Sequence, residues 1–260
     1  MTETSSMPAD HARDREATLQ NRANLEANHN LLHWYRELYR EHFEALPDSE
    51  NVKILEIGSG VSPLKRFYPN ILTSDVLDLD YLDYVFDCHD IDTFEPVADE
   101  SLNVIALTNV LHHLKDPIEF LNKAARKLRR GGKIIATEPY FSKLSTLIFV
   151  HLHHEPVDFD ITEPVLPEIK SPLGSANIAL PWLIFLRHPR WRDRLRANYE
   201  FDERNAQPFS SISYMATGGI SRRLPVPRSI YYPLFRIDMI LSRAFPKLLA
   251  SFFTVTLTRK

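Results

Sequence analysis

Two glycines and two acids early in the chain have the types and the spacing that a nucleoside-binding site needs. Gly58 and Gly60 follow the apolar run 52–57, where a backbone without side chains lets a ligand approach and offers it N–H donors. Asp75 lies 17 residues after Gly58, close to the ~20 expected for an acid that binds ribose hydroxyls in a dinucleotide fold. Asp87 could accept a hydrogen bond from an adenine amino group. Together these residues predict an adenosine pocket.

Histidines are the other residues whose chemistry stands out. His112 and His113 follow another apolar run, and an imidazole suits proton removal near neutral pH. Because neighbouring side chains point in different directions, we expect only one of the two to line a site and prefer His112; packing under a loop is the alternative role. His151, His154 and Glu155 could bind a metal on one helical turn. Hydrogen-bonded structure is the commoner role of such a loop cluster, so we assign no metal and keep His154 as a further candidate for proton removal.

The elements that position these residues are short apolar runs separated by helical or irregular segments. Strands are predicted at 52–57, 71–76, 84–86, 102–108, 133–137, 198–204 and 252–258, and helices at 19–46 and 117–130. Continuous apolar strands that alternate with helices indicate a parallel sheet covered on both faces. In such a sheet a ligand binds at the carboxyl ends of the strands, which is where the glycines, the acids and the histidine pair lie.

Five ordered motifs follow these strands and resemble a known family. The motifs are LEIGSG at 55–60, TSDV at 73–76, DCHD at 87–90, NVLHHLKDP at 109–117 and LRRGGKIIATEP at 128–139. In this order and spacing they resemble the class I S-adenosylmethionine-dependent methyltransferases, most closely the small-molecule branch often called type 11. The resemblance covers about residues 52–139 and the terminal strand. It implies an α/β fold with a Rossmann-like, doubly wound sheet of seven strands, mostly parallel with an antiparallel last strand.

The cofactor implied by this resemblance is S-adenosyl-L-methionine. Its methionine part would lie against the first glycine turn and the end of the fourth strand, and its ribose would lie against the second strand. Its adenine would lie against the segment after the third strand, where the His89 ring would cover it. The residues expected to bind it are Glu56, Gly58, Ser59, Gly60, Asp75, Val76, Asp87, Cys88, His89 and Asn109.

A dehydrogenase is the natural competitor, because its first turn looks similar. A dinucleotide needs room for a pyrophosphate at a helix N-terminus. Val61, Ser62, Pro63 and Leu64 stand here in place of the G-x-x-G portion, which favours a ligand without a pyrophosphate. Ser62 also replaces the third glycine of the family's usual G-x-G-x-G, so the detailed shape of this loop departs from the family pattern.

The chain divides into five predicted parts. Prolines recur between residues 139 and 181, which predicts a long irregular segment of the kind that forms lids and binding loops. The parts are a disordered polar tail at 1–16, a helical cap at 17–47, a cofactor-binding core at 51–140, a lid or acceptor insertion at 141–197, and the remaining core strands at 198–260 with a second insertion at 209–250.

Charge is distributed unevenly along the chain. Residues 74–100 contain ten acids and no Lys or Arg, which argues against a nucleic-acid partner there, while residues 211–260 contain eight Lys or Arg against the single acid Asp238. Apolar and aromatic residues accompany these cations, so contact with an anionic membrane surface is one expectation and a lid packed on the core is the other. The single cysteine and the N-terminus without an apolar segment fit a cytoplasmic protein. If the protein contacts a membrane, we expect it to do so on the cytoplasmic face.

These features predict methyl transfer from S-adenosylmethionine to a small-molecule or lipid-like acceptor, most simply at oxygen. The alternatives are a C-methyltransferase of a quinone-like or glycan-related substrate and a non-catalytic module that binds the cofactor only. A nucleic-acid methyltransferase is disfavoured, because the N/D-P-P-Y/F motif of amino-methylating enzymes is absent from the sequence.

Overall fold

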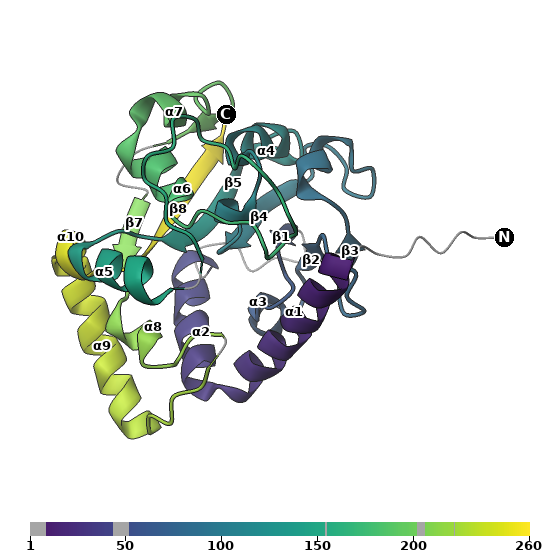
Figure 1. Cartoon of the computed structure of the whole chain (residues 1–260). Coiled ribbons are helices and arrows are strands. Elements are labelled where there is room, and N and C mark those ends of the chain that lie inside the picture. The colour runs from purple at the N-terminus through teal and green to yellow at the C-terminus, as the bar shows by residue number, and fades with distance from the viewer. Residues whose placement is uncertain (1–8, 44–51, 154, 202–205, 221) are drawn as a thin grey trace.

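The computed structural model describes residues 9–43, 52–153, 155–201, 206–220 and 222–260. A mixed sheet runs through the molecule and helices cover both of its faces (Figure 1). The strands are β1 (Ile54–Ile57), β2 (Leu72–Asp75), β3 (Tyr84–Val85), β4 (Leu102–Thr108), β5 (Leu128–Pro139), β6 (Tyr199–Glu200), β7 (Ala206–Phe209) and β8 (Phe252–Arg259). The helices are α1 (Ala9–Ala27), α2 (His29–Phe43), α3 (Leu64–Phe67), η1 (Cys88–Thr93), η2 (Leu111–His113), α4 (Pro117–Ala124), α5 (Lys143–Leu152), α6 (Leu180–Trp182), η3 (Leu183–Arg187), α7 (Pro189–Asp193), α8 (Ile212–Met215), α9 (Arg228–Ala244) and α10 (Pro246–Leu249).

The strand order is β3-β2-β1-β4-β5-β8-β6, with β7 also paired to β8. Strands β1 to β5 pair in parallel and β8 runs antiparallel to β5, which confirms the predicted sheet apart from its strand count. The described residues form eight strands rather than seven. The reason is that β6 and β7 both pair with the edge of β8 that faces away from β5, so the expected edge strand is present as two segments.

The core has two layers, one on each face of the sheet. Leu55 and Ile105 point into a layer formed with α4, η1 and the segment around α6, whereas Ile54 and Val104 point into a layer formed with α2 and α9. Successive strand residues therefore alternate between two buried faces, which explains why these strands are apolar throughout. Trp34 of α2 is fully buried in the second layer.

The first helix begins earlier than composition predicts. Residues 9–16 lie in α1, so the predicted disordered tail is wrong for this part, and the first eight residues of that tail lie outside the described residues. Two contacts with the body of the protein hold this turn of the helix. A carboxylate oxygen of Asp14 accepts from the Leu173 N–H at 2.9 Å, and Nε of Arg15 donates to the Asp78 carbonyl at 2.8 Å.

Two other predicted boundaries are wrong. The helix expected at 117–130 ends at Ala124, because the chain turns back to β4: the carbonyl of Lys127 accepts from Leu102 N–H, and Leu128 pairs with Leu102 in the sheet. The two glycines that follow lie within β5, where Gly131 has φ +73°. The segment expected to be irregular contains α5, whose first turn is fixed by a reciprocal capping pair of Ser142 and Ser145.

Helix α9 fixes the second insertion to the body of the protein through a buried acid. Asp238 is the only acid of α9. Its carboxylate accepts from the backbone N–H groups of Ser211, Ile212 and Ser213, at 2.8 to 3.2 Å, and from the Ser213 hydroxyl at 2.5 Å. These N–H groups belong to the first turn of α8, where they have no acceptor within their own helix, so Asp238 acts as a capping acceptor supplied from another helix.

Replacing Asp238 with alanine is expected to lower the free energy of unfolding by about 2–3 kcal/mol, because several buried donors lose their acceptor. Asp238→Asn keeps one oxygen acceptor and should lose less. Denaturant unfolding measures both, with the exposed Ser229→Ala on the same helix as a control that changes stability by less than about 0.5 kcal/mol. An alanine variant as stable as the unmodified protein would contradict the capping role.

Candidate active site

The turn after β1 brings three loops into close contact. Gly58 has φ +74°, and a Cβ at this position would lie 2.4 Å from Cγ2 of Val110, which follows β4. A Cβ on Gly60 would lie 2.8 Å from Cγ2 of Thr18 in α1 and 3.0 Å from Oδ2 of Asp75. Both positions therefore require glycine, and the ends of β1, β2 and β4 meet beneath the first helix.

Asp75 lies at the end of β2, beside this turn. Its Oδ2 accepts from Gly60 N–H and its Oδ1 accepts from Leu77 N–H, each at 3.0 Å. Burial raises the pKa of Asp75, although the hydrogen bonds from Leu77 and Gly60 oppose this shift. Each carboxylate oxygen has a second lone pair, so the group can still accept from two ligand hydroxyls. The neighbouring Val76 is partly exposed at the same strand end.

Glu56 is a buried acid under the glycine turn. Its Oε2 accepts from the Ser59 hydroxyl at 2.8 Å and its Oε1 from the Ser62 hydroxyl at 2.5 Å. Burial raises the pKa of Glu56 to about 7, while the two serine hydrogen bonds lower it. The Ser62 hydroxyl also hydrogen-bonds with Tyr39 Oη of α2 at 2.9 Å. The serine that replaces the family's third glycine therefore ties the loop to α2 and to Glu56.

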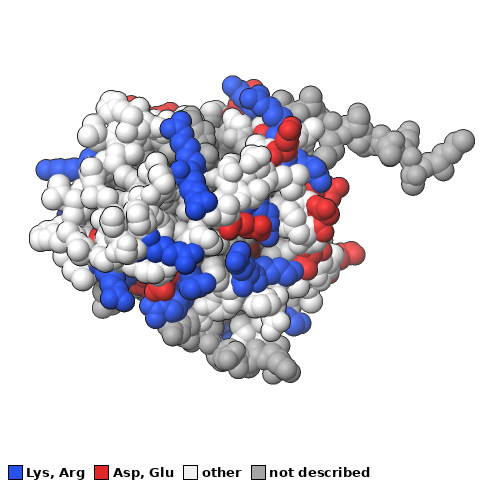
Figure 2. Space-filling model, turned by 90° about the horizontal axis from the view of Figure 1, so that it is seen from below, with Lys and Arg blue, Asp and Glu red and all other residues white. Residues whose placement is uncertain are grey.

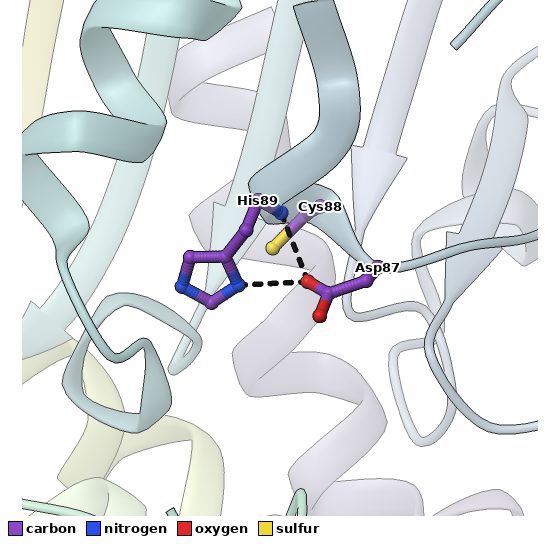
Figure 3. A group of neighbouring side chains, drawn as sticks. All are labelled: Asp87, Cys88 and His89. Atoms are coloured by element: carbon purple, nitrogen blue, oxygen red, sulfur yellow. Dashed lines mark hydrogen bonds and ion pairs between the residues drawn. The ribbon is translucent and has the colours of Figure 1, made fainter. Parts of the chain in front are cut away.

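The segment after β3 forms a local turn around one carboxylate oxygen (Figure 3). Oδ1 of Asp87 accepts from the His89 N–H at 2.9 Å and lies 2.7 Å from Nδ1 of the His89 ring. The side-chain hydrogen bond from His89 lowers the pKa of Asp87. The Cys88 side chain is buried between them, and burial raises the pKa of its thiol, as expected for a packing residue.

Three buried polar atoms around these strand ends have no hydrogen-bond partner among the described residues. They are Oδ1 of Asn109 after β4, Nε2 of His89 after β3 and Oγ1 of Thr18 in α1. Asn109 is held in place by its own backbone, with φ +57° and an N–H that donates to the Thr137 carbonyl. Leaving a buried polar atom unpaired costs about 1–3 kcal/mol, so a ligand with a nucleoside and an amino-acid end fits this donor and acceptor set.

The histidine pair forms the deepest polar cluster at this edge. Nδ1 of His112 lies 2.6 Å from Oε2 of Glu138, and Oε1 of Glu138 accepts from the N–H groups that precede His112. Nδ1 of His113 lies 2.9 Å from the Ser175 carbonyl. The Nε2 atoms of both rings face Glu155, each 3.6 Å from one of its oxygens. The ring centroids are 4.2 Å apart, so the expectation that the two side chains point in different directions is wrong.

The two imidazoles differ in charge. Burial lowers the pKa of His112, but the carboxylates of Glu138 and Glu155 more than offset this and raise it to about 10. Burial and the charge of His112 lower the pKa of His113 to about 4. Burial raises the pKa of Glu155, but its histidine neighbours bring it down to about 2. Without a bound ligand, the cluster at pH 7 therefore contains one imidazolium, one neutral imidazole and an ionised Glu155.

Sequence analysis alone did not identify every residue at this edge. Glu138 lies in the last of the five motifs without a predicted role, and nothing in the helical pattern around Thr18 indicates its contact with a distant turn. Glu155 was connected with His151, but His151 is exposed on α5 while Glu155 faces the histidine pair. His154 lies outside the described residues.

The sequence of the core matches a known family model. Residues 55–136 match the model described as a methyltransferase domain. These 82 of the 260 residues are the part of the chain that resembles a methyltransferase domain. The cofactor of this domain is S-adenosylmethionine, as the five motifs predict. The matched residues begin at Leu55 within β1, include the glycine turn and the histidine pair, and end at Ala136 within β5.

Solved structures resemble this chain at low sequence identity. A SAM dependent methyltransferase from Archaeoglobus fulgidus is 13% identical over 88% of this chain and 94% of its own, with a TM-score of 0.49. The citrinin polyketide synthase CMeT domain is 18% identical over 42% of this chain, with a TM-score of 0.33, and the DszA carbon methyltransferase is 16% identical over 44%, also with 0.33. The chain covers only 35% and 37% of the lengths of these last two. No curated protein matches the sequence.

Asp75→Ala is expected to weaken S-adenosylmethionine binding at least tenfold, because a buried two-point hydrogen bond to a ligand is worth about 1.5–3 kcal/mol. Calorimetry with the purified protein measures this. Asp80→Ala, which removes an exposed acid five residues further on, is the matched control and should bind as the unmodified protein does. Equal affinity in the two variants would overturn the ribose assignment.

Binding of the cationic cofactor is expected to depend on the ionisation of Glu56. A protonated Glu56 cannot stabilise a nearby cation, so binding below pH 7 must first remove a proton, and affinity should rise roughly five- to tenfold from pH 6 to pH 7.5. Calorimetry in buffers of different ionisation enthalpy should show proton release at pH 6.5. Glu56→Gln should bind more weakly and without this pH dependence; a variant with the same pH profile would contradict the assignment.

Proposed function

We propose that the chain transfers a methyl group from S-adenosylmethionine to an oxygen atom of a small-molecule or lipid-like acceptor. The observation that supports this most is the position of Asn109. Its buried, unpaired Oδ1 lies on the same loop as the His112 and His113 cluster, so the methionine end of the cofactor and a proton-accepting group would be neighbours. The matched methyltransferase domain covers the same loop.

The proposed cofactor residues divide by the part of the ligand that each would hold. The turn at Gly58, Ser59 and Gly60, with Glu56 beneath it, would lie against the methionine part. Asp75 and Val76 would hold the ribose, and Asp87, Cys88 and His89 the adenine. In this arrangement the ammonium group of the methionine part can donate to Asn109 Oδ1, which has no other partner among the described residues.

The acceptor is proposed to lie against the histidine and glutamate cluster. The cofactor, when bound, supplies a methyl group already activated on a sulfonium, so the protein's task is alignment and removal of the acceptor's proton. His113 and Glu155 are the accessible members, because their side chains are partly exposed while His112 and Glu138 are fully buried. An acceptor that must lose a proton from oxygen explains this cluster better than a cofactor-binding module, which needs no such groups.

Turnover separates an enzyme from a binding module. The purified protein is incubated with methyl-labelled S-adenosylmethionine and two acceptor pools, a polar metabolite extract and an organic lipid extract. We expect label in an ether or ester product, and we expect His113→Gln to lower turnover at least a hundredfold while S-adenosylmethionine affinity changes little. His188→Gln, at a half-buried histidine that precedes α7, is the matched control. Cofactor binding without label transfer to either pool would favour the binding module, and label on carbon would favour C-methylation.

A lipid-like acceptor is supported by the outer face of α9 and its neighbours. Helix α9 buries Tyr231, Phe235 and Asp238, whereas its outer face exposes aliphatic residues. Helix α10 packs against α5, and both expose further apolar side chains (Figure 1). The exposed apolar residues of this face are Ile230, Tyr232, Ile237, Ile240 and Leu241 of α9, Phe245 and Leu248 around α10, and Leu147, Val150 and Leu152 of α5.

The charges of this face match an anionic surface. Arg228, Arg236, Arg243 and Lys247 accompany the apolar residues, and the one acid of α9 is buried. Figure 2 shows Lys and Arg spread among uncharged residues over the face seen from below, with most of the acids of that face on one side. None of the described helices has both the length and the apolar content needed to cross a bilayer. We therefore propose peripheral contact with an anionic membrane, on its cytoplasmic face, and no nucleic-acid partner.

Vesicle sedimentation tests this contact. The protein should sediment with vesicles that contain anionic lipid more than with neutral ones, and the double variant Ile237→Glu and Ile240→Glu should reduce the bound fraction at least threefold, because charges replace apolar residues at the interface. Ile169→Glu, at an exposed isoleucine outside this face, should leave binding unchanged. Equal sedimentation of both variants, or none for the unmodified protein, would end this proposal.

A further inference from the structure

The histidine and glutamate cluster has the composition and orientation of a metal site. Nε2 of His112, Nε2 of His113 and a carboxylate oxygen of Glu155 all lie within 4.8 Å of one another. Two histidines and one carboxylate form the ligand set that binds divalent transition metals on one side and leaves other coordination positions open. The side chains come from η2 and from the segment after α5, so the set is assembled by the fold and differs from the helical-turn set that the sequence suggested.

Both rings are oriented by their other nitrogen. Nδ1 of His112 faces Oε2 of the buried Glu138 at 2.6 Å, and Nδ1 of His113 faces the Ser175 carbonyl at 2.9 Å. A histidine that binds a metal almost always donates its second N–H to a carboxylate or a backbone carbonyl in this way. Glu138 is itself held by two backbone N–H groups, so its position does not depend on His112. The Nε2 atoms are thereby directed toward the same side, where Glu155 lies.

The distances within the cluster allow an ion between the three side chains. Each Nε2 atom is 3.6 Å from the nearest Glu155 oxygen, beyond the usual N–H to oxygen range of about 2.7–3.2 Å. Ligand bonds of about 2.0–2.2 Å place neighbouring ligand atoms roughly 3–3.5 Å apart around a metal. The two 3.6 Å separations are close to that range, and the three ligand atoms lie within 4.8 Å of one another, so the side chains would move inward to bind an ion.

We infer that His112, His113 and Glu155 form a site for one divalent transition-metal ion of the zinc or iron class. The side chains of His113 and Glu155 are 16% and 18% exposed, so the ion would be reached from solvent and would keep a coordination position for an external oxygen ligand. This step rests on the proposed function: the oxygen ligand would be the acceptor's hydroxyl. A bound metal lowers the pKa of such a hydroxyl and holds it for alignment with the methyl group.

Metal titration tests the site without reference to activity. The full-length protein is freed of metal with EDTA, the chelator is removed, and Zn²⁺ is added in a calorimeter; Co²⁺ in a parallel sample reports ligand geometry by its visible absorption. We expect one equivalent to bind to the unmodified protein, and at least a hundredfold weaker binding in His113→Gln and in Glu155→Gln. His151→Ala, at an exposed histidine nearby, is the matched control and should bind as tightly as the unmodified protein.

Two results would overturn this inference: no uptake of Zn²⁺ or Co²⁺ by the unmodified protein, or affinities in the His113 and Glu155 variants equal to that of His151→Ala. Calorimetry of the same variants with S-adenosylmethionine shows whether they are folded and keeps the two proposals apart. Metal uptake without cofactor binding would contradict the proposed function and leave the metal site standing. Cofactor binding without metal uptake would contradict the metal site and leave the proposed function standing.

Discussion

The close approach of three loops at the carboxyl edge of the sheet is the constraint on which the rest of the structure depends. It is possible because Gly58 and Gly60 have no side chains: a methyl group on either would overlap with Val110, Thr18 or Asp75. The parallel strands bring the chain to the same edge repeatedly, and the two glycines let the ends of β1, β2 and β4 meet under α1. The acids and the polar atoms of the site are brought together by this contact.

The polar groups at this edge are of two kinds. Glu56, Asp75, Asp87 and Glu138 each accept from nearby N–H or hydroxyl groups, so their carboxylates are fixed before any ligand arrives. Three other polar atoms are buried without partners among the described residues: Asn109 Oδ1, His89 Nε2 and Thr18 Oγ1. A fixed set of acceptors beside a set of unpaired atoms is a preorganised site, because the cost of orienting the groups has already been met in folding.

Local sequence signals predicted the elements well and their tertiary partners poorly. The strand at Leu102–Thr108, the terminal strand and the glycine turn follow from apolar runs and from glycine spacing, which are properties of neighbouring residues. The end of α4 depends on Leu128 pairing with Leu102, and the early start of α1 depends on Asp14 meeting a loop far along the chain. Such contacts join residues that are distant in sequence, so composition and periodicity do not predict them.

The same distinction applies to the site. The residues proposed to bind the cofactor lie in motifs of a few residues, so their types and order are visible in the sequence. The cluster of His112, His113, Glu138 and Glu155 joins two segments that the sequence treated as separate histidine groups. Their convergence is a property of the fold, in which the segment after α5 returns to the end of β4.

The central claim is that the carboxyl ends of β1 to β4 hold one S-adenosylmethionine molecule. A crystal structure of the protein with S-adenosylhomocysteine tests it most directly. The account predicts ribose hydroxyls on the Asp75 carboxylate, adenine beside Cys88 and an amino group on Asn109 Oδ1. A ligand bound elsewhere, or bound at this edge without contact to Asp75 and Asn109, would contradict it.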